Sequence, residues 1–165
     1  MTVGSKSNSE TSQSKPSIER YNTADAMLDA LEEMGVTYLF SNFGSDHPAV
    51  IEALAKRKAL NKQPLEVIIC PHEIVALSAA HGNTMLSGQG QGVFVHTDVG
   101  TSNLGGTVHN AARSRIPVFI FAGETPYTLE GELPGSRRGP INYLQNVYDQ
   151  RGIIREYTKW EYDIR

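Results

Sequence analysis

The sequence predicts an α/β protein built on a doubly wound, mostly parallel sheet with helices on both faces. Two observations predict this fold. Short runs of apolar and β-branched residues alternate with longer segments of helical periodicity, and the runs are apolar throughout rather than alternately polar. Strands of that kind are buried on both sides, as in a parallel sheet covered by helices on each face. A chain of 165 residues is long enough for one such domain.

The elements follow one another in strand-loop-helix order. Asn22 or Thr23 is a suitable N-cap for a first helix over 24–34, which Gly35 ends. Strands are predicted at 37–40, 65–70, 93–95, 117–121 and 153–157. Further helices are predicted from Pro48 onward, over 73–86, over 103–113 and over 143–148.

The two ends of the chain differ in amino-acid composition from its middle. Residues 1–20 are polar and rich in Ser, Lys and Glu, so we expect a disordered tail there and one domain over 21–165. A long loop rich in Pro and Gly follows Gly123, and loops of that length are functional or mobile. No helix follows the last predicted strand, so we expect a domain truncated at its C-terminus, with its last helix missing.

Composition excludes several classes of partner. Fifteen basic and eighteen acidic residues give a net charge of -3 without long blocks, which predicts neither nucleic acid nor a membrane surface as partner. No apolar stretch is long enough for a membrane span or a secretory signal. We therefore expect a cytoplasmic protein, with a mitochondrial location as the alternative because the first residues are Ser-rich. The single cysteine, Cys70, lies in an apolar run and is predicted to be a buried thiol.

Several common site motifs are missing. The glycine run 88–92 precedes a strand, where a dinucleotide motif would follow one, and no glycine loop ends in Gly-Lys-Ser/Thr. The five histidines show no zinc spacing, so we expect no metal site within this chain. A nucleophile elbow of the Gly-x-Ser-x-Gly kind is also missing.

Ligands of open parallel sheets collect beyond the carboxyl ends of strands, so the loops at 41–46, 71–73, 97–103 and 123–125 are candidates. Glu73 opens a helix that is small or apolar on nearly every face, which indicates burial in the domain or against another subunit. Glu73 is either a charge favoured by the helix dipole or a functional carboxyl group. Gly100 to Asn103 could bind an anion at a helix start.

Three groups of segments, in this order and spacing, carry a family resemblance. They are 26–35 with 38–44, Pro71-His72-Glu73 with 79–82, and 96–103 with 110–111, 117–118 and 122–123. Together they resemble the N-terminal pyrimidine-binding domain of thiamine-diphosphate-dependent enzymes of the acetolactate synthase and benzoylformate decarboxylase type. The resemblance covers essentially the whole chain after residue 20.

The resemblance implies roles for particular residues. The family glutamate at the position of Glu73 hydrogen-bonds a ring nitrogen of the aminopyrimidine, and the proton they share leads to the ylide that attacks a 2-keto acid. Burial beside Ile74 and Val75 would raise the pKa of this carboxyl group. His72 is implied as a catalytic proton-transfer or substrate-contacting group, with a helix-capping role as the alternative. Further implied residues are Asn42, Gly44, Gly100, Thr101 and Asn103 at the cofactor, and Ser45 and Gln145 near the substrate.

The sequence also departs from the family. Gln145 lies in Leu-Gln-Asn, where acetolactate synthases have Phe-Gln-Glu, and the Gly-Asp-Gly motif that binds Mg²⁺ and diphosphate is missing. We therefore expect half of a thiamine diphosphate site, completed in a homo-oligomer or by a diphosphate-binding domain or subunit that carries the Mg²⁺. Three alternatives stay open: a non-catalytic module that pairs with a full-length relative, one subunit of a split 2-keto acid decarboxylase, and a generic nucleotide-binding protein.

Overall fold

The computed structural model describes residues 21–62, 65–133, 135–137 and 139–164. Its centre is a four-stranded sheet in the order β2-β1-β3-β4. The strands are β1 (Tyr38–Ser41), β2 (Glu66–Ile69), β3 (Gln91–Val95) and β4 (Val118–Ala122), and all three pairings are parallel. The predicted parallel sheet is confirmed, whereas the predicted disordered tail at 1–20 lies outside the described residues.

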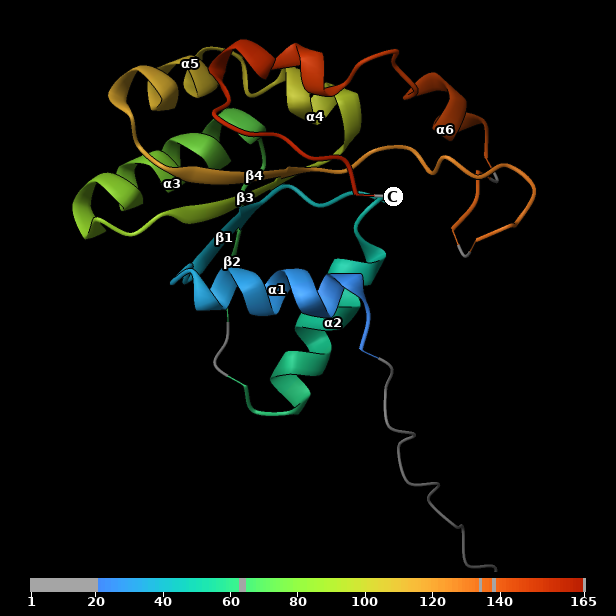
Figure 1. Cartoon of the computed structure of the whole chain (residues 1–165), viewed down its shortest axis with the longest axis horizontal. Helices are drawn as coiled ribbons and strands as arrows, with labels where there is room; N and C mark the ends of the chain where they lie inside the picture. Colours follow the sequence, from blue (N-terminus) through green and yellow to red (C-terminus); the bar gives the residue numbers. More distant parts are fainter. Residues whose placement is uncertain (1–20, 63–64, 134, 138, 165) are drawn as a thin grey trace, which may run out of the picture.

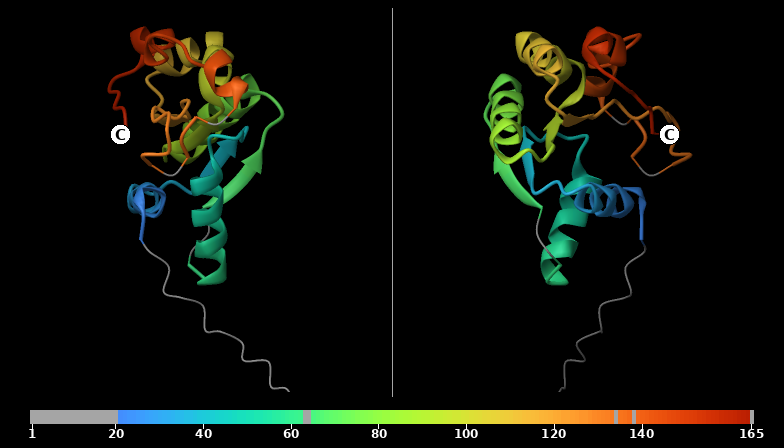
Figure 2. Two further views of the ribbon diagram at one scale, coloured as in Figure 1. Left: turned by 90° about the vertical axis from the view of Figure 1, so that its right-hand side faces the viewer. Right: turned by 60° about the vertical axis from the view of Figure 1, so that its left-hand side comes forward.

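Helices cover both faces of this sheet. On one side lie α1 (Thr23–Glu33) and α2 (Pro48–Ala59), and on the other lie α3 (Glu73–Ser87) and α5 (Gly105–Ser114), as Figure 1 shows. The turned views in Figure 2 keep α2 and α3 on opposite sides of the strands. A short helix, α4 (Thr97–Ser102), follows β3 directly. The arrangement confirms the predicted α/β fold with helices on both faces.

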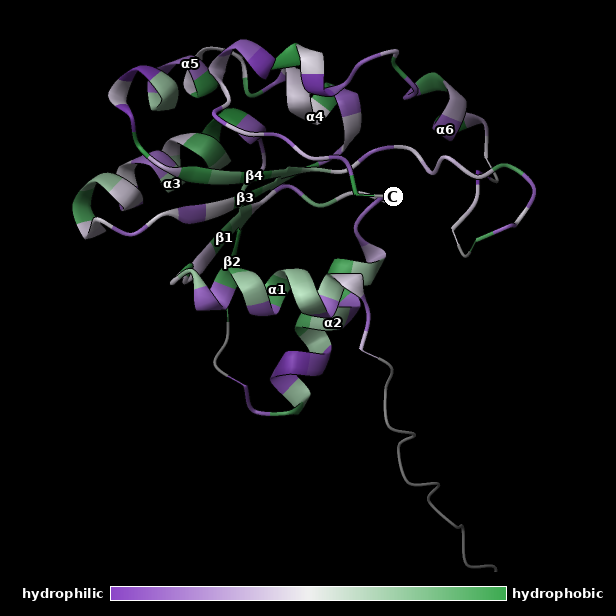
Figure 3. Cartoon of the chain, viewed as in Figure 1, coloured by the Kyte–Doolittle hydropathy of each residue, from purple (hydrophilic) through white to green (hydrophobic). Residues whose placement is uncertain are grey.

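Two apolar clusters hold the layers together. Successive strand residues point to opposite faces, so β3, which is buried along its whole length, contributes to both clusters. Phe94 packs with Leu28 and Leu31 of α1, whereas Val93 and Val95 pack with the α3 side. Figure 3 shows that the strands are mostly apolar, whereas apolar and polar residues alternate along the helices.

The first helix begins as the sequence predicts. The Asp25 N–H donates to Asn22 Oδ1 at 3.0 Å, and the Asn22 N–H donates to Asp25 Oδ2 at 2.9 Å. This reciprocal cap satisfies two N–H groups at the start of α1. Gly35, with φ of 82°, follows the end of the helix. Cys70 is 3% exposed, so the predicted buried thiol is also confirmed.

Three predicted elements are wrong in detail. The segment 153–157 is not a strand but belongs to two 3₁₀ turns, η1 (Arg151–Ile153) and η2 (Arg155–Tyr157). Local bonds such as Tyr157 N–H to the Ile154 carbonyl at 2.9 Å satisfy its backbone, and no neighbouring strand is paired with it.

The other two corrections concern helix boundaries. The helix expected at 143–148 is α6 (Pro140–Leu144), which begins at a proline, a residue suited to the first helical position. The helix expected at 103–113 is divided, because Asn103 caps α4 and Gly105, with φ of 34°, starts α5. No helix in the described part of the chain is long and apolar enough to cross a membrane.

Candidate functional site

The carboxyl ends of neighbouring strands bring three loops together. Because β1 lies between β2 and β3, the loop after β1, the start of α3 after β2 and the start of α4 after β3 meet at one edge. This is the place where open α/β sheets bind ligands. Two buried carboxylates, Glu73 and Asp46, lie there.

Glu73 is the first residue of α3 and is 5% exposed. Asn42 Nδ2, from the loop after β1, donates to Glu73 Oε1 at 2.8 Å. Asn103 Nδ2, from the end of α4, donates to Glu73 Oε2 at 2.9 Å. Each oxygen of the carboxylate therefore has a neutral amide donor, and the two donors fix its plane. The structure brings together three residues that the resemblance implied for one site.

The electrostatics of Glu73 correct one expectation. Burial, the largest influence, raises the pKa of this carboxyl group, as the sequence predicts. The hydrogen bonds from Asn103, from the Glu73 backbone and from Asn42, with the nearby His72, outweigh burial and leave the pKa below its ordinary value. The predicted raised pKa is wrong for this chain, because donors to the ionised form favour it more than desolvation disfavours it.

The other residues near Glu73 have different tasks. His72 caps α3, accepting a bond from the Ile74 N–H at 3.2 Å, and its Nδ1 lies 3.7 Å from Glu73 Oε2. A Cβ on Gly100 would lie 3.2 Å from Glu73 Oε1, so this glycine keeps space open beside the carboxylate. Thr101 points its hydroxyl inward, donating to the Thr97 carbonyl at 2.7 Å.

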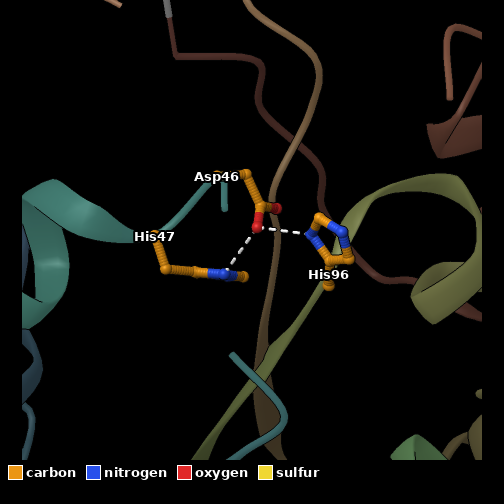
Figure 4. Close-up of side chains that lie close together, drawn as sticks. All are labelled: Asp46, His47 and His96. Carbon is orange, nitrogen blue, oxygen red and sulfur yellow. Dashed lines mark hydrogen bonds and ion pairs between the residues drawn. The ribbon is translucent and has the colours of Figure 1, made fainter. Parts of the chain in front are cut away.

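The second carboxylate, Asp46, lies between two imidazole rings (Figure 4). Its Oδ1 is 2.6 Å from Nδ1 of His96 and 2.8 Å from Nδ1 of His47. Its Oδ2 accepts a bond from the Thr97 N–H at 3.3 Å. Burial raises the pKa of Asp46, but the bonds and charges of His47 and His96 together bring it below its ordinary value.

Two glycines make room for this cluster. A Cβ on Gly44 would lie 2.1 Å from His96 Nδ1, and a Cβ on Gly123 would lie 1.6 Å from Asp46 Oδ2. Both distances are far below contact, so the cluster needs glycine at these positions. The implied cofactor residue Gly44 thus lies against the His96 ring.

Gln145 approaches the cluster from the end of α6. Its Nε2 lies 3.1 Å from His96 Nε2. Gln145 also lines a small cavity of about 40 Å³ together with Ser45, Asp46 and Thr97. Both residues that the resemblance implied for the substrate side therefore lie on the Asp46 side of the site rather than beside Glu73.

The sequence did not single out Asp46, His47 and His96 as site residues. Their spacing fits no linear motif, because the Asp46 and His96 partners are 50 residues apart. The topology gives the signal that could have found them, since Asp46 follows β1, His96 follows β3, and β1 pairs with β3. Polar residues at the ends of adjacent parallel strands are neighbours.

The same three side chains offer potential metal ligands within 4.8 Å of one another. Their contacts, however, are those of a hydrogen-bonded network, with both rings at bonding distance from one carboxylate oxygen. The Gly44 N–H also donates to His47 Nδ1, at 3.1 Å. Both Nδ1 atoms and Asp46 Oδ1 therefore already have polar contacts within the chain.

The fold and these two clusters define an α/β domain that carries its site at the carboxyl ends of parallel strands. The family described as "Thiamine pyrophosphate enzyme, N-terminal TPP binding domain" matches residues 21–153. The chain therefore belongs to this family as its N-terminal, thiamine-pyrophosphate-binding domain.

Individual relatives agree with this assignment. The chain is 27% identical over 106 residues to the "Putative acetolactate synthase large subunit IlvX" of Mycobacterium tuberculosis (strain ATCC 25618 / H37Rv), covering 62% of the chain and 19% of the relative. An X-ray structure of a "putative thiamin diphosphate-dependent enzyme" from Mycobacterium smegmatis is 27% identical with a TM-score of 0.55, covering 66% of the chain and 20% of that protein.

A third similarity concerns the fold alone. The thiamine diphosphate-dependent 4-hydroxybenzoylformate decarboxylase of Rhodococcus jostii RHA1 is 22% identical, with a TM-score of 0.62 over 83% of the chain and 23% of that protein. The chain thus spans about a fifth of the length of these relatives.

Proposed function

We propose that this chain supplies the pyrimidine side of a thiamine diphosphate site, in an acetolactate-synthase-like enzyme that decarboxylates or carboligates 2-keto acids. The observation that carries the proposal is Glu73, a buried carboxylate at the strand-end edge with both oxygens oriented by amides from neighbouring loops. The family assignment supports the cofactor. The reaction class rests on the names of the relatives.

The residues around Glu73 fit the aminopyrimidine of the cofactor. Each carboxylate oxygen has two lone pairs, and Asn42 and Asn103 occupy one on each oxygen. The remaining lone pairs leave Glu73 able to share a proton with a ring nitrogen. When bound, thiamine diphosphate supplies the nucleophilic carbon that takes up a 2-keto acid.

The pKa of Glu73 would respond to a bound ring. A ring and a covering domain would remove more water from Glu73, and desolvation raises the pKa of a carboxyl group. Binding of the ring should therefore move the pKa of Glu73 upward.

The second half of the site belongs to another domain or subunit. Mg²⁺ and diphosphate need a set of carboxylate and carbonyl oxygens, and the Gly-Asp-Gly motif that provides them in the family is missing from the sequence. We propose that this chain acts within a homo-oligomer or with a diphosphate-binding domain. His72 would contact substrate or transfer a proton, Ser45 and Gln145 would face the substrate, and Gly100 and Thr101 would line the cofactor.

The outward face of α3 supports a protein partner. Ile74 and Val75, directly after Glu73, are 45% and 48% exposed, and Met85 near the other end of the helix is 61% exposed. Apolar groups gathered on one helix and open to water are typical of a contact surface. The same face would serve the alternative function, a non-catalytic module that pairs with a full-length relative.

The pyrimidine half can be tested without the second domain. We expect 4-amino-5-(aminomethyl)-2-methylpyrimidine, added to the ¹⁵N-labelled chain, to shift the side-chain NH₂ signals of Asn42 and Asn103. Glu73→Gln should abolish these shifts, because an amide replaces the carboxylate that faces the ring.

Glu66→Gln is the matched control, since it makes the same chemical change at an exposed position of β2. Shifts that persist in Glu73→Gln, or that are missing in the unaltered chain, would contradict the proposed site. Binding of a diphosphate-domain partner without any rate change in Glu73→Gln would favour the non-catalytic module.

A further inference from the structure

The contacts of Asp46, the second carboxylate at this edge, are not explained by the Glu73 site. We propose that Asp46 is a positioning residue, which holds His96 in the tautomer protonated at Nδ1 and so leaves Nε2 as the proton-accepting atom of the site. As a role in catalysis this rests on the proposed function. The tautomer itself is a property of the chain alone.

Two contacts on opposite sides of the ring agree on the tautomer. An ionised carboxylate only accepts hydrogen bonds, so the 2.6 Å contact of Asp46 Oδ1 with His96 Nδ1 requires a proton on Nδ1. The NH₂ group of Gln145 only donates, so its 3.1 Å contact with His96 Nε2 requires a lone pair there. A neutral imidazole meets both requirements in one form only.

Asp46 is in turn held from its far side. His47 is fully buried, and its ring lies against the rings of Phe43 and Phe121. The Gly44 N–H donates to His47 Nδ1 at 3.1 Å, and Asp46 Oδ1 lies 2.8 Å from the same nitrogen. The buried ring of His47 therefore limits where the Asp46 carboxylate can lie on this side.

The backbone after His96 is shaped to fit the same carboxylate. Thr97 has φ of 48°, in the left-handed region that β-branched residues avoid, and it is 1% exposed. This conformation brings its N–H to 3.3 Å from Asp46 Oδ2, while its carbonyl accepts the Thr101 hydroxyl at 2.7 Å. Backbone strain of this kind persists where the surroundings fix it, and it concentrates at functional sites.

Together these contacts specify both oxygens of Asp46. Oδ1 lies within 2.8 Å of the Nδ1 atoms of both imidazoles, and Oδ2 accepts a bond from a backbone N–H. An asparagine at this position would keep its oxygen toward the Thr97 N–H, because an NH₂ group cannot accept. Its NH₂ would then face His96 Nδ1 and require the opposite tautomer, protonated at Nε2. A carboxylate is therefore needed for this tautomer, whereas a side chain of the same size is not enough.

The arrangement gives His96 a defined chemical role. Its side chain is 28% exposed, so the ring is reachable from solvent, and its Nε2 is next to Gln145, which lines the small cavity with Ser45. A ligand group that displaces the Gln145 amide would meet a nitrogen lone pair at a fixed place. That nitrogen could accept a proton and later return it, with Asp46 stabilising the charged ring.

The test is the tautomer of His96, read from long-range ¹H–¹⁵N correlations of the imidazole nitrogens at a pH where the ring is neutral. The signal is assigned by its loss in His96→Gln. We expect protonation at Nδ1 in the unaltered chain and a change to Nε2 in Asp46→Asn. Asp29→Asn, on α1, makes the same chemical change away from the cluster and should leave His96 unaltered.

The outcomes separate this inference from the proposed function. An Nε2-protonated His96 in the unaltered chain, or an unchanged tautomer in Asp46→Asn, would overturn it even where the aminopyrimidine binds at Glu73. The expected change would support it even where no aminopyrimidine binds. Zn²⁺ added alone should bind weakly; tight binding that removes both His47 and His96 signals would identify a metal site and contradict the positioning role.

Discussion

Glu73 and Asp46 are two buried carboxylates at the same edge of the sheet, and their partners differ in kind. Glu73 is held by two neutral amides, from Asn42 and Asn103. Asp46 is held by two imidazoles and a backbone N–H. In both cases burial raises the pKa, but the bonds and charges around the carboxylate lower it by more, so both groups favour the ionised form.

The difference shows how one edge can separate two tasks. Amides carry no titratable proton, so the surroundings of Glu73 orient the carboxylate without competing for the proton that a ligand would share. An imidazole nitrogen can either donate or accept a proton, so Asp46 contacts groups with a different hydrogen-bonding chemistry from the amides around Glu73. The two clusters therefore offer a ligand different chemistry.

The substitution with the largest expected effect disrupts the Asp46 cluster and leaves the Glu73 cluster intact. Gly123→Ala places a Cβ 1.6 Å from Asp46 Oδ2, so the carboxylate must move. Overpacking typically costs about 1–3 kcal/mol of unfolding free energy, and a separation this far below contact puts Gly123→Ala at or above the upper end of that range. Urea denaturation should show the loss, and the His96 imidazole signals should change while those of the Asn103 side chain do not. An equal disturbance of both sets of signals would contradict the separation of the two clusters.

A matched change tests the first cluster. Asn103→Ala removes the donor to Glu73 Oε2, a bond to a buried charged group, and should cost about 1.5–3 kcal/mol. The pKa of Glu73 should rise, since a bond that favours the ionised form is lost. Gln145→Ala is the comparison in the second cluster, because it removes a bond to a neutral ring and should cost about 0.5–1.5 kcal/mol. A larger loss in Gln145→Ala would reverse the ranking.

The dependence of stability on pH gives a third comparison. The pKa of Glu73 is lower in the folded chain than its ordinary value, so its contribution is complete above that value, near 4, and is lost as pH falls through the folded-state pKa. The difference in unfolding free energy between the unaltered chain and Glu73→Gln should therefore be largest near neutral pH and shrink below about pH 4. A difference that grows on acidification would show that the folded-state pKa is raised instead.

The smallest effect concerns a glycine that no contact with the described residues requires. A Cβ on Gly82, inside α3, would meet none of their atoms within 4 Å, in contrast to Gly123. Gly82→Ala should stabilise the chain by about 0.5–1 kcal/mol, because alanine favours the helix. Thermal denaturation of the chain measures this gain. A loss of stability at protein concentrations where the chain self-associates would show that a partner helix uses this space.

Much of the fold could be predicted from local pattern. The four strands of the sheet, the N-cap at Asn22 and the start of α3 at Glu73 each depend on a few neighbouring residues, and each was placed to within about two residues. The strand predicted at 153–157 was wrong because an apolar, β-branched run forms a strand only where a neighbouring strand offers it hydrogen bonds. At that place Arg155 forms ion pairs with Asp149 and Glu161 instead, and the backbone bonds locally.

The candidate site was also predictable only in part. The family resemblance identified Glu73, Asn42 and Asn103, and the structure joins them. The direction of the Glu73 pKa could not be predicted, because burial is visible in the apolar run that follows Glu73 whereas the two amide donors come from residues 31 positions before and 30 positions after it. Desolvation is a property of the neighbourhood, but each hydrogen bond depends on geometry.

By itself the sequence determined the alternation of strands and helices, which follows from hydrophobic periodicity, and the edge of the sheet at which the candidate loops gather. The family resemblance, and not periodicity, singled out the carboxyl group of Glu73. Only the tertiary structure decided which polar groups became partners. The pairing of β1 with β3 placed Asp46 against His96, and the close approach at Gly44 and Gly123 allowed it, because contacts between distant residues are set by the packing of whole strands and not by local propensity.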